Sequence, residues 1–92
     1  MRYIYMVTRD VTGAEKGVVY IANLGMHTSH SSADRHFESV KKSREAAGCI
    51  VCWDINTPGG PTIGKMQEVR SARIEYNGDT VEHLKIEKWR IR

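Results

Sequence analysis

Apolar residues recur at short, regular intervals along the last third of the chain, and this pattern predicts one long β-hairpin over residues 68–92. Asn77-Gly78 lies between the two apolar runs. This dipeptide favours a type I′ turn, because both central residues of that turn need a positive φ. The expected cross-strand pairs are Tyr76 with Asp79, Ile74 with Val81, Arg73 with Glu82 and Val69 with Ile86.

The apolar positions of this hairpin change sides along its length. Because the side chains of a strand alternate between two faces, such a change needs a β-bulge or a strong twist. We therefore expect a bulge or coil near Arg70 and Ser71 and another near Glu87 and Lys88. The base of the hairpin would then pack in the core, while its tip would present its side chains elsewhere. The tip residues are Ile74, Tyr76 and Val81.

Three further apolar runs predict the other strands. Residues 2–8 and 18–23 are rich in aromatic and β-branched residues, and their simplest arrangement is an antiparallel pair. Both runs carry apolar residues on both faces, so we place them near the middle of the sheet. Residues 49–55 form a third strand. Residues 9–17 and 56–64 contain glycines or prolines that break regular structure, and they are expected to be loops.

One helix is predicted over residues 32–47, capped by Ser31 or Ser32 and ended by Gly48 in a left-handed conformation. Asp34 would lie in its first turn, where a carboxylate suits the helix dipole. The stripe expected to be buried comprises Ala33, Phe37, Val40 and Ala47, with Arg44 interrupting it. The sequence thus predicts an α+β fold in a single domain of residues 1–92: a mainly antiparallel sheet of about five strands, one α-helix packed on it and a long C-terminal hairpin.

The charge composition narrows the possible partners. The chain has 92 residues, with 14 Lys and Arg against 11 Asp and Glu, a net charge of +3. Acidic residues are interleaved with basic ones, which disfavours both a concentrated nucleic-acid patch and a negatively charged mimic of DNA. The sequence has no apolar run of about 18 residues and no signal-peptide pattern at its start, so we expect a cytoplasmic protein without membrane contact.

Cys49 and Cys52 are the two cysteines of the chain, too few for a disulfide framework. Positions three apart in a strand face opposite sides, so the two thiols are expected to diverge and to be buried and inert. A zinc site with His27 and His30 would form only if this strand assignment is wrong. We therefore expect no metal and no cofactor.

The same cysteines could act as nucleophiles with a histidine as the base. The candidate bases are His27, His30, His36 and His83. The sequence indicates no third group that would orient such a pair, and a chain of this length leaves little volume for a cleft. A non-enzymatic protein without catalytic residues is the expectation, and a small zinc- or thiol-dependent protein is an alternative.

Residues 59–65 fit the G-x-x-x-x-G-K pattern of a phosphate-binding loop. That loop needs Ser or Thr after the lysine, to hold magnesium, and a helix whose N-terminus faces the phosphates. Here Met66 follows Lys65, Pro61 stiffens the loop, and the downstream residues have an extended pattern. A surface loop is therefore expected in place of a nucleotide site.

Basic and aromatic residues are concentrated in the predicted hairpin, and arginines beside aromatic rings suit phosphate contacts combined with base stacking. The candidate partner- or nucleic-acid-binding residues are Arg70, Arg73, Tyr76, Lys85, Lys88, Trp89, Arg90 and Arg92. Placed at alternating positions, they would form a stripe. Four glutamates lie in the same ribbon, so the alternative is a solvated edge whose charges are neutralised by cross-strand pairs.

Three functions are compatible with a small domain that lacks a recognisable catalytic set. The chain could be an inhibitor or modulator that binds a large protein or ribonucleoprotein complex. It could be an accessory single-stranded RNA- or DNA-binding module that uses the hairpin and sheet. It could also be the small metal- or thiol-dependent protein described above. The sequence leaves the oligomeric state open.

In layout, the chain resembles the small phage-encoded inhibitors of host defence, in particular the anti-CRISPR proteins. The resemblance lies in the short chain, the antiparallel strands, the helix over residues 32–47 and the final hairpin at Asn77-Gly78. It implies stoichiometric binding to a CRISPR surveillance complex and a block of target-DNA capture. The net charge of +3 departs from the acidic, DNA-mimicking members and better suits contact with guide RNA or acidic protein surfaces. Arg35, Lys41 and Lys42 of the helix would then join the hairpin residues as contacts.

Overall fold

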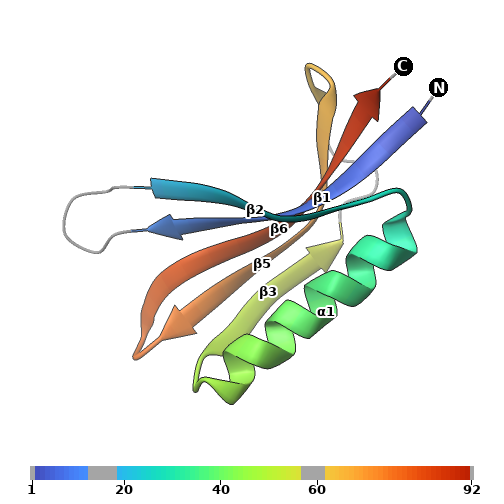
Figure 1. Ribbon diagram of the computed structural model, residues 1–92. Helices are drawn as coiled ribbons and strands as arrows, with labels where there is room; N and C mark the ends of the chain where they lie inside the picture. Colours follow the sequence, from blue (N-terminus) through green and yellow to red (C-terminus); the bar gives the residue numbers. More distant parts are fainter. Residues whose placement is uncertain (1, 13–18, 57–61, 92) are drawn as a thin grey trace.

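The computed structural model describes residues 2–12, 19–56 and 62–91. Its elements, in chain order, are β1 (Arg2–Thr12), β2 (Val19–His27), α1 (His30–Ala46), β3 (Ile50–Asn56), β4 (Thr62–Ile63), β5 (Met66–Tyr76) and β6 (Asp79–Ile91). In these residues one helix packs on an antiparallel sheet (Figure 1), which confirms the predicted α+β fold. No helix of the described ranges is long and apolar enough to cross a membrane.

The described strands are ordered β2-β1-β6-β5-β3, and the short strand β4 pairs with β5 beside this path. The first strand is therefore internal, as expected, but β2 lies at an edge, and its predicted central place is wrong. The reason is that β6 pairs with β1 from Arg2 opposite Ile91 to Val11 opposite Glu82. This pairing joins the two ends of the chain (Figure 1), and a local pattern cannot reveal it.

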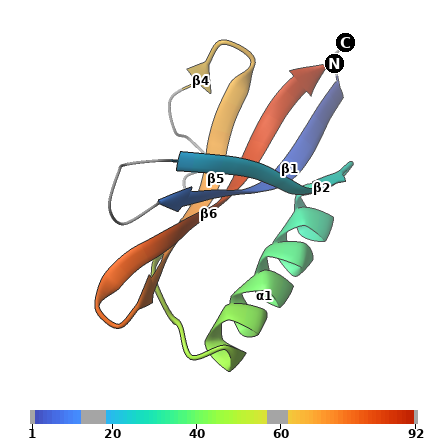
Figure 2. The ribbon, with the colours of Figure 1, turned by 60° about the vertical axis from the view of Figure 1, so that its left-hand side comes forward.

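Helix α1 lies across one face of the sheet (Figure 2) and contacts β1, β2, β3 and β6. The apolar core fills the space between the two layers. Its buried residues are Val7, Ala33, Phe37, Val69, Ala72, Ile74, Leu84 and Ile86. Full burial of a side chain such as Phe37 contributes roughly 1.5–3 kcal/mol, so this two-layer arrangement is held mainly by the contact between α1 and the sheet.

The hairpin turns where the sequence predicts. Asn77 and Gly78 have φ values of 53° and 85°, as a type I′ turn requires, and Tyr76 pairs with Asp79. Glu75 opposite Thr80 keeps the same register, and beyond that pair the predicted register is wrong. The register shifts between Ile74 and Glu75, so that the other predicted pairs are replaced. Ile74 lies opposite Glu82, Arg73 opposite His83 and Arg70 opposite Ile86.

Two bulges cause this register. Val81 is the extra residue of β6 near the turn, and Val69 is the extra residue of β5 near the base. The second lies one residue from the bulge expected near Arg70, whereas β6 runs in step with β1 through Glu87 and Lys88, so the bulge expected there is wrong. Because Val81 is an extra residue, Ile74 lies opposite Glu82, and both side chains are buried on the core side of the sheet. Ile74 is fully buried and Val81 packs against the core, so the expectation that they face elsewhere is also wrong; Tyr76 is exposed.

Helix α1 begins two residues earlier than predicted. Ser29 is the N-cap, and its Oγ accepts a hydrogen bond of 3.2 Å from the backbone N–H of Ser32. Asp34 consequently lies beyond the first turn, and the proposed caps Ser31 and Ser32 lie inside the helix. Ser29, Ser31 and Ser32 offer equivalent caps locally, and the choice among them depends on where β2 ends.

The end of the helix follows the prediction. Gly48 has a φ of 90°, its N–H donates to the Glu45 carbonyl at 3.0 Å, and the Cys49 N–H donates to the Arg44 carbonyl at 3.0 Å. These two bonds form a Schellman motif. The buried stripe is shorter than expected, because Ala47 is exposed and Val40 is partly buried.

Two buried charges on the sheet face the helix. The Arg70 guanidinium lies 4.0 Å from the centre of the Phe37 ring and forms ion pairs with Asp34, Glu38 and Asp54. Glu82 accepts hydrogen bonds from Arg44 Nε at 2.8 Å and Nη2 at 3.3 Å. A buried charge is tolerated only when it is paired. The position of Arg44 within the apolar stripe is therefore explained by its ion pair with the buried Glu82.

A bulge in β3 orients one of these partners. The register of β3 against β5 shifts between Cys52 and Ile55, and Trp53 adopts a φ of 56°. Trp53 is 65% exposed, while the next residue, Asp54, contacts Lys41 of α1 at 2.6 Å. Without the extra residue, strand alternation would turn Asp54 away from the helix.

Candidate anion-binding site

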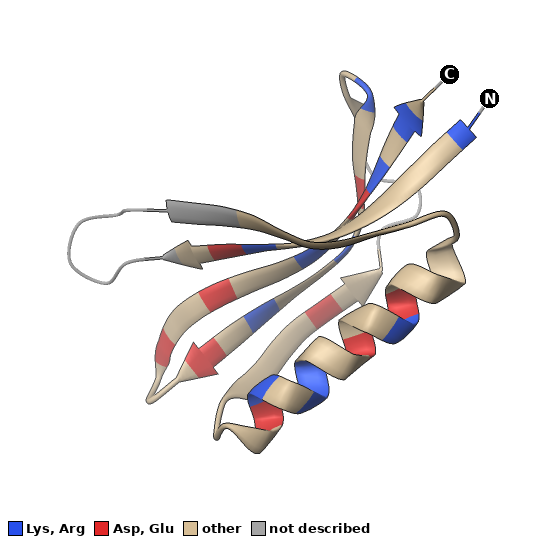
Figure 3. Cartoon of the chain, viewed as in Figure 1, with Lys and Arg blue, Asp and Glu red and all other residues tan. Residues whose placement is uncertain are grey.

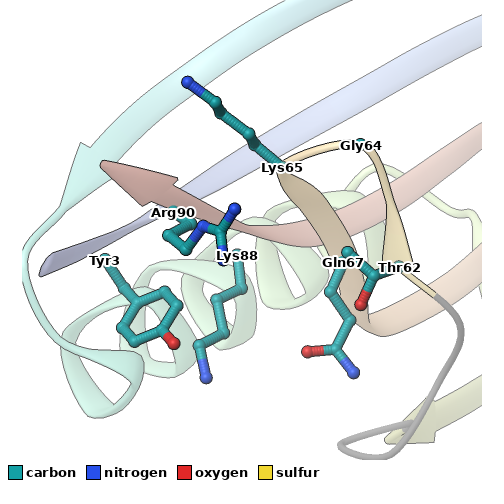
Figure 4. Close-up of a pocket in the computed structure, with 7 residues that line it drawn as sticks. All are labelled: Tyr3, Thr62, Gly64, Lys65, Gln67, Lys88 and Arg90. Atoms are coloured by element: carbon teal, nitrogen blue, oxygen red, sulfur yellow. The ribbon is translucent and has the colours of Figure 1, made fainter. Parts of the chain in front are cut away.

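A small cavity of about 160 Å³ lies at the base of the hairpin. Three segments meet there: the start of β1, the turn between β4 and β5, and the end of β6 (Figure 4). The described residues that line it are Tyr3, Thr62, Gly64, Lys65, Gln67, Lys88 and Arg90. The cavity is smaller than the roughly 300–1,000 Å³ typical of small-molecule sites, so it suits a single small group better than a nucleotide.

The turn that forms one wall depends on Gly64. Ile63 pairs with Met66, which leaves Gly64 and Lys65 as the two turn residues, and Gly64 has a φ of 62°. A positive φ at the first turn position is typical of a type II′ turn and favours glycine. The backbone N–H of Arg90 donates to the Lys65 carbonyl at 2.9 Å, which ties this turn to the end of β6.

Strand register brings the other walls together. Lys88 lies opposite Gln67 on β5, and Arg90 lies opposite Tyr3 on β1, so these side chains share one face of the sheet. The Lys88 Nζ lies 4.1 Å from the centre of the Tyr3 ring, a cation–π contact. In Figure 4, Lys88 and Gln67 stand side by side with a gap between them, and the Lys65 amine points away from the gap.

The lining is positively charged. None of its described residues is acidic, and Lys65, Lys88 and Arg90 form no ion pair with a carboxylate of the described chain. The nearest glutamates in sequence, Glu68 and Glu87, pair with each other across the strands one position away, and alternation turns them to the opposite face. Figure 3 shows basic segments at this end of β6 and at the β4–β5 turn.

Three of the six basic residues predicted to form a stripe, Arg70, Arg73 and Lys85, are paired with carboxylates. Arg70 is buried and forms ion pairs with three carboxylates. Lys85 Nζ lies 2.6 Å from Asp10, Lys41 Nζ lies 2.6 Å from Asp54, and Arg73 Nη2 lies 2.9 Å from Glu75. The expectation of one exposed basic stripe along the hairpin is therefore wrong, because alternation and ion pairing divide its charges.

The remaining candidates are spread over the surface. Arg35 and Lys42 border a shallow open groove on α1 together with Asp34, Glu38 and Ser39. Tyr76 is exposed at the hairpin tip, and Trp89 donates from Nε1 to Glu87 at 3.2 Å on the face opposite Lys88. Arg92 lies outside the described residues. Of the eleven predicted contact residues, Lys88 and Arg90 reach the cavity.

Sequence reasoning missed the other cavity residues. The sequence places Gly64 and Lys65 only at the end of a possible phosphate-binding loop. Because β5 begins at Met66, an extended segment follows them as predicted. Residues 59–61 of that motif lie outside the described ranges. The glycine–lysine turn was the available signal. Tyr3, Thr62 and Gln67 had no local signal, because they reach the cavity through strand pairing.

The histidines and cysteines serve other contacts. Cys49 packs against the core, whereas the Cys52 thiol donates to the Arg73 carbonyl at 3.5 Å. His27 hydrogen-bonds through Nδ1 to Ser32 Oγ at 2.8 Å and through Nε2 to His36 Nδ1 at 2.9 Å. Within the described ranges, no three His, Cys, Asp or Glu side chains are grouped so that they could hold a metal ion.

Comparison of the sequence with protein-family models, with curated proteins and with solved structures gives no match. The resemblance in layout to anti-CRISPR proteins therefore stays a prediction.

Proposed function

We propose that this protein is a non-enzymatic binding protein that inhibits a larger ribonucleoprotein and contacts its RNA through the cationic cavity at the hairpin base. One observation carries the proposal. Lys65, Lys88 and Arg90 line one cavity without a carboxylate partner among the described residues, while the other hairpin cations described above are neutralised. Phosphate oxygens are acceptors of the kind that lysine and arginine bind well.

The energetic cost of a new contact also favours this cavity. A phosphate that bound Lys85 would have to displace Asp10 from 2.6 Å, and one that bound Arg70 would have to enter the core. At the cavity, the side chains of Lys65 and Arg90 are exposed and have no ion pair with a carboxylate among the described residues, so an anion would displace no such partner. The cavity is therefore the place where an external anion gains most from the protein's charge.

The small number of cations favours an RNA held within a complex over free RNA. Even if each of the three cations met a separate phosphate of a single strand, the logarithm of the binding constant would fall against the logarithm of salt concentration with a slope of only about −2. Binding of that kind is weak at physiological salt, so a specific inhibitor needs contacts with the partner's protein as well. The resemblance in layout described above suggests a CRISPR surveillance complex as the partner, with target-DNA capture as the blocked step.

Two measurements test this function. Fluorescence anisotropy with an internally labelled single-stranded RNA that carries hydroxyls at both ends should give weak, salt-dependent binding. The variant Lys88→Ala/Arg90→Ala should lose it, and the control Arg35→Ala/Lys42→Ala should retain most of it. Retention by the cavity variant equal to that of the wild type would contradict the proposed contact.

The second measurement concerns the partner. In an affinity pull-down from the native host, the wild type should retain an RNA-containing complex that the cavity variant does not retain. That complex should lose its capture of target DNA when one equivalent of the protein is added. A captured complex that contains no RNA, or one that the cavity variant retains equally well, would overturn the proposal.

A further inference from the structure

The small volume of the cavity favours the end of a chain over a segment within one. Its walls stand on different strands: Tyr3 on β1, Lys88 and Arg90 on β6, and Gln67 on β5 (Figure 4). The volume of about 160 Å³ leaves room for one phosphate but is small for a nucleoside as well. A phosphodiester within a strand carries two ester substituents, and both would have to leave such a hollow. A terminal phosphate has only one.

The charge of the ligand also favours a terminal phosphate. A phosphate monoester carries about −1.5 to −2 at pH 7, whereas a backbone phosphodiester carries a single negative charge. The described lining offers three cations and no carboxylate. A monoester therefore matches this lining better, because a second negative charge is attracted by the same fixed cations without further reorganisation.

We propose that the cavity binds a terminal phosphate monoester of a single-stranded RNA. This inference rests on the proposed function, and it specifies which part of the RNA the protein contacts. An end-specific contact would place the protein at one terminus of the RNA in a ribonucleoprotein, in contrast to an arbitrary place along the strand.

Lys88 and Arg90 have distinct parts in this site. The ring of Tyr3 holds the Lys88 ammonium at 4.1 Å, so that this cation is positioned before the phosphate arrives. The backbone of Arg90 is fixed by its bond to Lys65, and its exposed guanidinium supplies donors that match two phosphate oxygens. Lys65 stands at the rim on the β4–β5 turn with its amine pointing away from the gap, and it adds positive charge without a direct contact there (Figure 4).

The test compares one short single-stranded RNA sequence in three forms: with a 5′-phosphate, with a 3′-phosphate and with hydroxyls at both ends. The wild type should bind at least one phosphorylated form about tenfold more tightly than the hydroxyl form, as one additional charge-assisted hydrogen bond would give. Lys88→Gln and Arg90→Gln should each remove most of this preference. Lys42→Gln, which changes an exposed lysine of α1, should leave it intact.

The outcomes separate this inference from the proposed function. If all three RNAs bind equally well and the cavity variants lose binding, the protein contacts internal phosphates; the end-specific site is then wrong and the proposed function stands. If none of the three RNAs binds, the end-specific site is wrong and the RNA contact of the proposed function fails with it. If free phosphotyrosine displaces the phosphorylated RNA as well as an unlabelled copy of that RNA does, the cavity selects a phosphorylated protein and the RNA assignment is overturned.

Discussion

Arg70 holds Asp54 through two hydrogen bonds, from Nε to Oδ1 at 3.0 Å and from Nη2 to Oδ2 at 2.8 Å. The bulge in β3 makes this pair possible, because it turns Asp54 toward the helix-facing side of the sheet. The same guanidinium covers Phe37 and reaches Asp34 and Glu38 of α1. One arginine thus connects β5, β3 and the helix, and its role is structural.

The substitution Arg70→Ala is expected to lower the free energy of unfolding by about 2–4 kcal/mol. It removes the cation over Phe37 and leaves the Asp54 carboxylate without its two-point partner. Urea denaturation followed by circular dichroism measures the change. Arg90→Ala, at an exposed position, is the matched control and should change stability by less than about 0.5 kcal/mol. Equal effects of the two substitutions would show that Arg70 does not anchor the helix.

Stability should fall in acid as this network is protonated. Hydrogen bonds from Arg70, and then from Lys41, lower the pKa of Asp54 from 3.8 to about 2. A carboxylate whose pKa is lowered in the folded state stabilises the fold above its unfolded pKa, and this contribution is lost as the pH falls from about 4 to about 2. Since solvent screens part of the interaction, we expect a contribution of about 1 kcal/mol.

The variant Asp54→Asn tests this assignment. Its free energy of unfolding should be lower than that of the wild type at pH 6, and the difference should shrink as the pH approaches 2. Urea titrations at four or more pH values would give the profile. A difference that stays constant between pH 6 and pH 2 would mean that the Asp54 charge does not contribute.

A side chain at position 25 would clash with His36. A Cβ atom built at this position would be 2.7 Å from His36 Cε1 and 2.9 Å from Nδ1, and His36 is held by its hydrogen bond to His27. Gly25→Ala should therefore destabilise the fold by about 1–3 kcal/mol, as overpacking does. Thermal unfolding of Gly25→Ala, His36→Ala and the double variant would show the coupling. The double variant should be more stable than the sum of the two single effects predicts; strict additivity would mean that the clash is absent.

Trp53 occupies a left-handed backbone conformation that a bulky residue rarely adopts. Its strain, of order 1–3 kcal/mol, is opposed by a cation–π contact with Arg73 at 5.5 Å, worth about 0.5–1 kcal/mol at an exposed site. Trp53→Asn should therefore be neutral or slightly stabilising, since asparagine tolerates this conformation. Trp53→Val should destabilise by at least about 1 kcal/mol, because a β-branched residue does not. Chemical denaturation of both variants decides the point, and equal stabilities would place the strain elsewhere.

Features that depend on single residues could be predicted from the sequence. The turn at Asn77-Gly78 and the helix end at Gly48 need a positive φ, and these residues accept it wherever they stand. The helix itself and the alternating strands followed from periodicity, and so did the α+β class. Of the cavity, Lys88 and Arg90 were among the predicted contact residues, because they stand at alternating positions of one strand.

The tertiary structure decided the rest, because it depends on which residues meet across the chain. The bulges at Val81 and Val69 set the register between β5 and β6. Because β1 pairs with β6 on its other side, β2 lies at an edge of the sheet. Lys85 and Arg70 look like surface cations in the sequence, yet their carboxylate partners lie on other elements. The sequence by itself determined where charges and turns lie along the chain. The fold determined which charges are neutralised and which have no carboxylate partner among the described residues, since neutralisation depends on distances between strands that no local pattern encodes.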